Sequence, residues 1–89
     1  MINVKEAVQK AAEYFAELYL RKFPNVLVEE IERSGTDWLV TLGYDDIPEF
    51  SEMFSHLPMK PSRRFKLFRI DGETGEVKSM KIREVEHVE

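Results

Sequence analysis

Two strands joined by a tight turn are encoded by residues 63–83, which read RRFKLFRIDGETGEVKSMKIR. The Asp71 carboxylate and the Thr74 hydroxyl can accept hydrogen bonds from backbone N–H groups of the turn. Gly72 and Gly75 are expected to supply the positive φ angles that tight turns need. A calcium loop would need more oxygen ligands at regular spacing than this segment offers, so a β-hairpin is predicted.

The apolar residues of this hairpin predict an irregularity in its second strand. Phe68 and Ile70 are two positions apart and therefore share one face of the first strand. Val77 and Met80 are three positions apart, so a strict period of two cannot place both on one face of the second strand. We therefore predict a β-bulge at residues 78–79, or a separate role for Val77 at the turn.

An amphipathic helix is predicted over residues 4–22. Asn3 is a good N-cap residue, and Glu6 follows three positions later as in a capping box. Apolar residues then recur at close to the helical period, and Pro24 ends the helix because it cannot donate a backbone hydrogen bond. The apolar stripe indicates a helix that covers a sheet.

Alternating β-branched and aromatic residues predict a second hairpin, with strands at 26–33 and 38–44 and a turn at 34–37. The chain is therefore expected to be α+β: one long N-terminal helix packed on a four-stranded antiparallel meander sheet. The expected core residues are Val8, Ala12, Phe15, Trp38, Val40, Leu42, Phe68, Ile70, Met80 and Ile82.

Length and composition predict a single domain, residues 1–89. The chain has no cysteine, so it has no disulfide framework and no thiolate metal site. No segment reads as a signal peptide, and no apolar run approaches the roughly 20 residues of a membrane-spanning helix. A cytoplasmic protein without a membrane partner is expected.

Charge is distributed unevenly along the chain. Residues 1–59 carry 5 Lys/Arg and 11 Asp/Glu, whereas residues 60–83 carry 8 Lys/Arg and 3 Asp/Glu, and residues 84–89 form an acidic tail. In one interpretation the basic hairpin pairs across the sheet with acidic residues of the segment 29–32. In the other, the hairpin faces a partner.

The segment 45–62 is a long insertion between the second and third strands, and it holds three of the four prolines. Its apolar residues fall at helical spacing and favour a short helix near 47–56. They either cap the core or contact a partner. The candidate partner-binding residues are Ile47, Phe50, Met53, Phe54, Leu57 and Met59.

Residues with catalytic or ligating chemistry are few. His56 and His87 are the only imidazoles, and neither lies at metal-ligand spacing from a partner. No glycine-rich loop precedes a long helix, so a phosphate-binding loop is not expected. The sequence predicts no catalytic, metal or cofactor site.

Nucleic-acid binding is an alternative, because cations and aromatic side chains interleave in the C-terminal hairpin. The acidic sequence pI of about 5.2 disfavours it. The candidate basic patch comprises Arg63, Arg64, Lys66, Arg69, Lys81 and Arg83.

The run Ile70-Asp71-x-x-Thr74-Gly75-Glu76-Val77 resembles the last hairpin of PepSY domains, which are small cystatin-like modules. The chain is also similar to small uncharacterised bacterial proteins with the same hairpin ending. The PepSY resemblance implies contact with peptidases and implies no catalytic residues.

The expected function is a non-enzymatic protein-binding module, inhibitory or regulatory in its effect. A protein partner would contact the segment 45–62 and one sheet face or edge, and a homodimer could form through a sheet face or an edge strand. The alternatives are nucleic-acid binding and a small-molecule or enzymatic pocket between helix and sheet.

Overall fold

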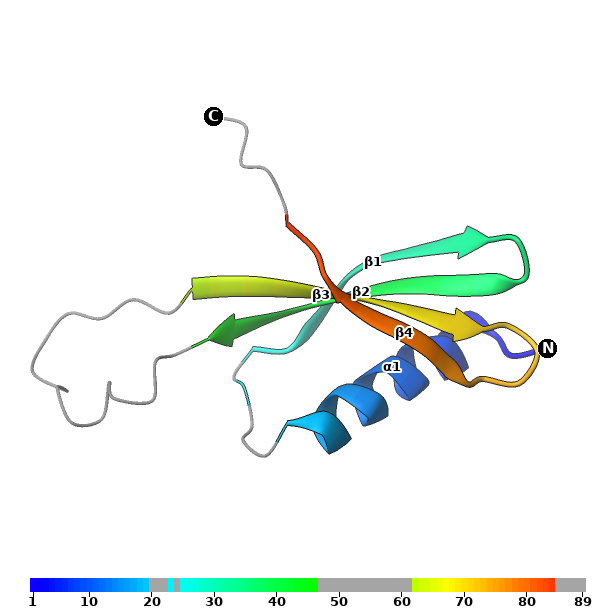
Figure 1. Ribbon diagram of the computed structural model, residues 1–89, viewed down its shortest axis with the longest axis horizontal. Helices are drawn as coiled ribbons and strands as arrows, with labels where there is room; N and C mark the ends of the chain where they lie inside the picture. The colour runs from blue at the N-terminus through cyan, green and yellow to red at the C-terminus, as the bar shows by residue number, and fades with distance from the viewer. Residues whose placement is uncertain (20–22, 24, 47–61, 85–89) are drawn as a thin grey trace, which may run out of the picture.

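The computed structural model describes residues 1–19, 23, 25–46 and 62–84. These residues form a helix, α1 (Val4–Leu18), and four strands: β1 (Leu27–Ser34), β2 (Asp37–Asp46), β3 (Ser62–Asp71) and β4 (Val77–Ile82). The strands pair antiparallel in sequence order, and α1 lies against one face of the sheet (Figure 1). The predicted α+β meander is confirmed.

The helix begins where the sequence predicts and ends earlier. The Asn3 side chain accepts a hydrogen bond from the Glu6 backbone N–H at 2.9 Å, which caps the first turn. Tyr19 is already extended, with a ψ of 128°, so the prediction of a helix continuous to residue 22 is wrong. The Tyr19 ring instead packs on Phe15 and Phe23, with ring centroids 4.8 and 5.2 Å apart, and the chain leaves the helical path.

The core lies between α1 and the central strands. In α1 the buried positions are Ala7, Ala11 and Phe15, which recur every four residues and face the sheet. Ala12 was predicted to be buried but is exposed, because it lies about 100° around the helix from Ala11. The buried core residues are Ala7, Ala11, Phe15, Val40, Leu42, Tyr44, Phe68 and Ile70.

The predicted core residues at the margin of the sheet are less buried. Val8, Trp38 and Met80 are partly buried and pack against the core. Ile82 was predicted to be buried and is 74% exposed. The end of β4 rises away from α1, so nothing in the described part of the helix covers Ile82 (Figure 1).

The predicted bulge in β4 is present. Arg69 pairs with Ser79 and Ile70 pairs with Val77, which leaves Lys78 as the extra residue. The bulge lets Val77 and Met80 both pack against the core, although they are three positions apart.

The turn between β3 and β4 is held as its sequence predicts. The Asp71 carboxylate accepts hydrogen bonds from the N–H groups of Glu73 and Thr74, at 2.8 and 3.1 Å. The Thr74 hydroxyl accepts a third from the Glu76 N–H at 3.2 Å. These bonds satisfy backbone donors that the tight turn leaves without a strand partner.

The two glycines of this turn have different roles. Gly75 has a φ of +78°, as predicted, whereas Gly72 does not have a positive φ, and that part of the prediction is wrong. At Gly72 the constraint is space, because a Cβ would lie 1.8 Å from the Thr36 carbonyl oxygen. The tips of the two hairpins therefore touch at Gly72, and its carbonyl also accepts a 2.7 Å hydrogen bond from the Ile2 N–H.

Candidate functional site

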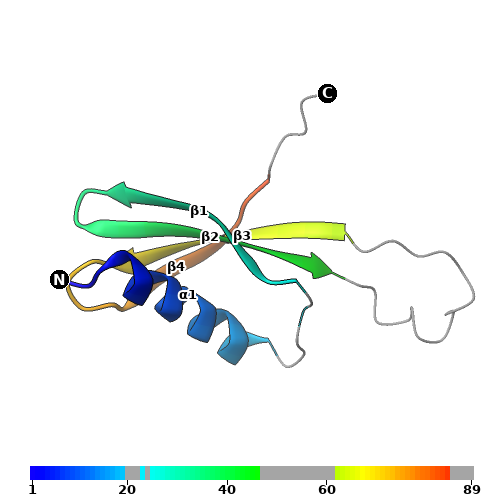
Figure 2. The same ribbon diagram turned by 180° about the vertical axis from the view of Figure 1, so that it is seen from behind.

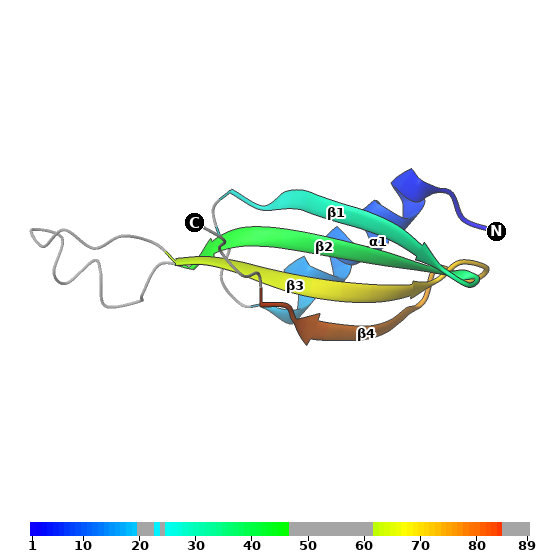
Figure 3. The ribbon, with the colours of Figure 1, turned by 90° about the horizontal axis from the view of Figure 1, so that it is seen from above.

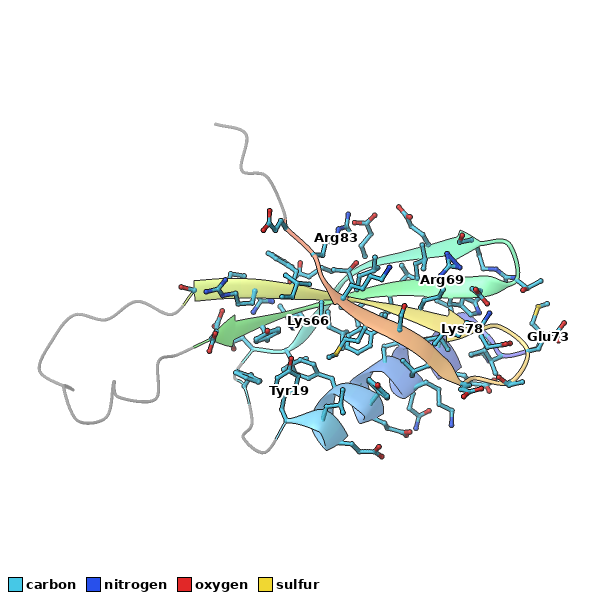
Figure 4. The ribbon with its side chains drawn as sticks, in the orientation of Figure 1. Tyr19, Lys66, Arg69, Glu73, Lys78 and Arg83 are labelled. Carbon is cyan, nitrogen blue, oxygen red and sulfur yellow. The ribbon has the colours of Figure 1, made fainter. Side chains whose placement is uncertain are left out.

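The sheet has one covered face and one open face. The buried apolar residues of β2 and β3 face α1, so their alternate neighbours point to the other side, which we call the open face. Figure 4 shows Arg69 and Arg83 on the open face and Tyr19 on the helix side. The open face of β2 and β3 comprises Asp37, Leu39, Thr41, Gly43, Asp45, Arg63, Phe65, Leu67, Arg69 and Asp71.

A first cluster of charges on the open face is centred on Arg63. The guanidinium lies 2.7 Å from a Glu29 carboxylate oxygen and 3.2 Å from one of Asp45. It also donates to the Asn25 carbonyl at 2.6 Å. The Asn25 side chain, followed by Arg63, lowers the pKa of Asp45 by hydrogen bonding, while Glu29 and Asp45 raise the pKa of Arg63. Arg63 thus ties β3 to β1 and β2.

A second cluster surrounds Asp37, whose side chain is only 8% exposed. Its carboxylate lies 2.9 Å from the Lys78 ammonium and 2.7 Å from the Arg69 guanidinium. Hydrogen bonds from Lys78 and then Arg69 lower the pKa of Asp37, and burial opposes them only in part. The sequence pattern indicated only a turn at Asp37 and gave no sign of this role, because Lys78 reaches it only through the β4 bulge.

A third cluster joins the end of the β4 segment to β1. The Arg83 guanidinium lies 2.7 Å from Glu30 and donates at 2.7 Å to the buried Thr41 hydroxyl. Glu32 lies two positions from Glu30 on the same face of β1, so a second carboxylate lies near the Glu30–Arg83 ion pair. Hydrogen bonding to Glu32 and then to Arg83 lowers the pKa of Glu30, whereas Glu30 raises the pKa of Glu32.

These clusters bear on the interpretation in which the basic hairpin pairs across the sheet, while the interpretation in which it faces a partner stays a prediction. The predicted pairing across the sheet is confirmed for Glu29 and Glu30. Of the predicted basic patch, Arg63, Arg69 and Arg83 are engaged in ion pairs on the open face. Arg64 and Lys66 pair in register with Tyr44 and Leu42 and so lie on the helix side, and Lys81 lies on the open face opposite Leu67. The patch is therefore divided between two faces and largely neutralised.

The structure also has a shallow groove of about 540 Å³ at the N-terminal end of β3. There β3 extends beyond Lys66, the residue that pairs with Ile82 at the end of β4. Its cations include Arg63 and Arg83, which are already paired with carboxylates. None of its lining residues belongs to α1, whereas the pocket considered in the sequence analysis would lie between helix and sheet. The lining residues are Tyr44, Asp46, Arg63, Arg64, Phe65, Lys66, Ile82, Arg83 and Glu84.

Three of the four exposed large apolar side chains in the described strands lie on β1. The helix packs against β2, β3 and β4, and β1 rises away from it (Figure 2). Leu27, Val28 and Ile31 are 58%, 42% and 37% exposed. Since β1 is an edge strand, it also presents backbone N–H and C=O groups on its outer side. This edge combines apolar side chains with backbone that can pair.

The six candidate partner-binding residues at 47–59, with both histidines, lie outside the described residues, and their assignment stays a prediction. Within the residues that are described, no group of three or more His, Cys, Asp or Glu side chains could hold a metal ion. None of the described helices is long and apolar enough to cross a membrane.

Comparison with protein-family models finds no match to this chain. Comparisons with curated proteins and with solved structures likewise find no match.

The lowered pKa of Asp37 predicts that the stability of the fold decreases at acidic pH. A carboxyl group whose pKa is lower in the folded state stabilises the fold above the ordinary aspartate pKa of about 4, and this stability is lost as the pH falls through the lowered value. Replacing Lys78 by glutamine removes the largest cause of the shift, so the pKa of Asp37 is expected to rise. Carboxyl ¹³C NMR titration of both proteins measures it, and an unchanged Asp37 pKa would contradict the proposed ion pair.

Proposed function

We propose that this protein is a non-enzymatic protein-binding module that captures an extended segment of its partner by strand addition along β1. The observation that carries the proposal is the exposure of Leu27, Val28 and Ile31 on an edge strand that α1 leaves uncovered. Strand addition uses backbone hydrogen bonds for affinity and alternate side chains for specificity. A cytoplasmic location and an inhibitory or regulatory effect, both expected from the sequence, belong to the same proposal.

The two sides of β1 define the chemistry of the segment. Glu30 and Glu32 pair in register with Thr41 and Leu39 and therefore lie on the open face, where Arg83 forms an ion pair with Glu30. Val28 and Ile31 pair with Leu42 and Val40, which face α1, and therefore lie on the helix side. The complementary segment alternates cationic and apolar side chains.

The ion pairs on the open face weigh against the nucleic-acid alternative. Arg63, Arg69, Lys78 and Arg83 are engaged with carboxylates of the chain itself. A phosphate backbone would have to compete with those carboxylates for the same cations. The β1 edge, by contrast, has exposed groups that the described part of the chain leaves accessible.

We expect Ile31→Lys to weaken binding of a synthetic peptide as long as β1, in which lysine alternates with valine, by about tenfold or more. A lysine on the helix side of an edge strand removes the apolar contact and repels a cationic segment. Fluorescence anisotropy of the labelled peptide measures the affinity. The single tryptophan, Trp38, gives a second signal, because the guanidinium of Arg33 on β1 lies 4.4 Å from its ring centroid and binding at β1 should change the surroundings of the ring.

The matched control is Ile82→Lys, which makes the same substitution on the opposite edge strand. It should leave peptide affinity unchanged. A peptide in which glutamate alternates with valine should bind much more weakly than the lysine peptide. Equal weakening by the two lysine substitutions, or equal binding of the two peptides, would refute the assignment of the β1 edge.

A further inference from the structure

The two edge strands of the sheet are complementary to each other. Within the described strands, every large apolar residue that is exposed belongs to an edge: Leu27, Val28 and Ile31 on β1, and Ile82 on β4. On the open face, β1 has Glu30 and Glu32, whereas β4 has Lys81, for which no ion pair with a described residue is found. One edge is thus acidic and apolar, and the other is basic and apolar.

The pairing register aligns these groups in rows that cross the whole sheet. Each row begins on β1 and ends on β4 with a residue of matching chemistry. The two rows that begin with an apolar residue on β1 also end with an apolar residue on β4. The row that begins with Glu30 ends with a lysine. The rows are Val28–Leu42–Lys66–Ile82, Glu30–Thr41–Leu67–Lys81 and Ile31–Val40–Phe68–Met80.

The topology allows these rows to continue into a second molecule. β1 and β4 run in opposite directions, because each of the four strands is antiparallel to the next. A second copy displaced sideways in the same orientation, with the usual twist between neighbouring strands, therefore places its β4 antiparallel to β1. Both helices then lie on the same side. Figure 3 shows the two edges that would meet, with β1 and β4 at opposite sides of the sheet.

We propose that the β4 edge of a second copy is itself a ligand of the β1 edge, so that this protein associates head to tail. In that register Ile82 of the second copy lies beside Val28, its Lys81 beside Glu30 and its Met80 beside Ile31. The pairing covers Ile82, the most exposed large apolar side chain of the described strands. It rests on the strand-addition surface of the proposed function and names one occupant for it.

This mode of association differs from a symmetric dimer. A twofold β1–β1 pair would place glutamates of the segment 29–32 near one another, and like charges across a strand pair are destabilising. The head-to-tail contact is heterologous and leaves one free edge at each end, so the wild-type assembly grows beyond a dimer unless it closes into a ring.

Two single variants test the proposal by complementation. Ile31→Lys blocks the β1 edge and Ile82→Lys blocks the β4 edge, while each leaves the other edge intact. Sedimentation velocity at concentrations up to about 1 mM should show concentration-dependent assembly of the wild type and monomers of each variant alone. An equimolar mixture of the variants should form a dimer and nothing larger, since only one productive contact is left.

Other outcomes would overturn the inference. A monomeric wild type together with a monomeric mixture excludes the contact, and a dimer formed by Ile82→Lys alone shows symmetric β1 pairing instead. Circular dichroism of each variant checks the fold, and Val28→Lys replaces Ile31→Lys if that variant is unfolded. If the wild type binds the lysine–valine peptide but does not self-associate, the head-to-tail inference is rejected and the proposed function stands. If the wild type self-associates as expected but does not bind the peptide, the proposed function alone is rejected.

Discussion

Replacing Phe68 by alanine is expected to lower the free energy of unfolding by about 3–5 kcal/mol. Phe68 is fully buried and is the largest of the fully buried side chains. Its ring packs edge-on against Tyr14 and Phe15, with centroids 6.3 Å apart in both pairs. Small domains have a total stability of about 5–15 kcal/mol, so the variant should lose a large fraction of its stability.

Urea denaturation followed by circular dichroism measures this loss, with Ile82→Ala as the control. Ile82 is 74% exposed, so its truncation should change the free energy of unfolding by no more than about 0.5 kcal/mol. If the two variants lost similar stability, the core would not lie between α1 and the centre of the sheet.

Replacing Gly72 by alanine is expected to cost about 3 kcal/mol of unfolding free energy, at the upper end of the usual range for overpacking. The added Cβ would lie 1.8 Å from the Thr36 carbonyl oxygen, which is backbone and cannot rotate away as a side chain can. The two hairpin tips would have to separate, and the hydrogen bond from the Ile2 N–H to the Gly72 carbonyl would be strained.

The matched control is Gly35→Ala in the other hairpin turn. Gly35 has a φ of +61°, and no atom of the described residues outside its own turn neighbours lies within 4 Å of an added Cβ. Alanine at this position should lower the free energy of unfolding only by the cost of a left-handed backbone conformation, about 1–2 kcal/mol. The melting temperature of Gly72→Ala should therefore be lower than that of Gly35→Ala, and both should be lower than that of the wild type. The reverse ranking would show that the tips are not in contact.

Local patterns in the sequence predicted the local structure well. The hydrogen bonds of Asp71 and Thr74 involve residues at most three positions away, so a short stretch of sequence specifies them. The bulge at Lys78 followed from the broken alternation between Val77 and Met80 in the same way. Short turns join β1 to β2 and β3 to β4, and because strands that follow one another in sequence usually pair, the meander was the simplest topology.

Features that depend on contacts between distant segments were not predictable in this way. Gly72 is needed because of Thr36, and the buried Asp37 is paired through Arg69 and Lys78. Counting charges located the basic hairpin but could not show that Arg63, Arg69 and Arg83 form ion pairs within the chain, because the partners depend on strand register. The exposure of the β1 edge could likewise not be predicted, since the alternation of apolar and polar residues does not reveal how many strands of a sheet a helix covers.

Site-resolved amide hydrogen exchange of β1, with and without the lysine–valine peptide, tests the central claim most directly. Outward-pointing N–H groups of Leu27–Ser34 have no strand partner in the described structure and should exchange quickly in the free protein. Strand addition predicts that they become protected when the peptide binds, while β4 is unchanged. Protection confined to β4, or binding without any protection of β1, would contradict it.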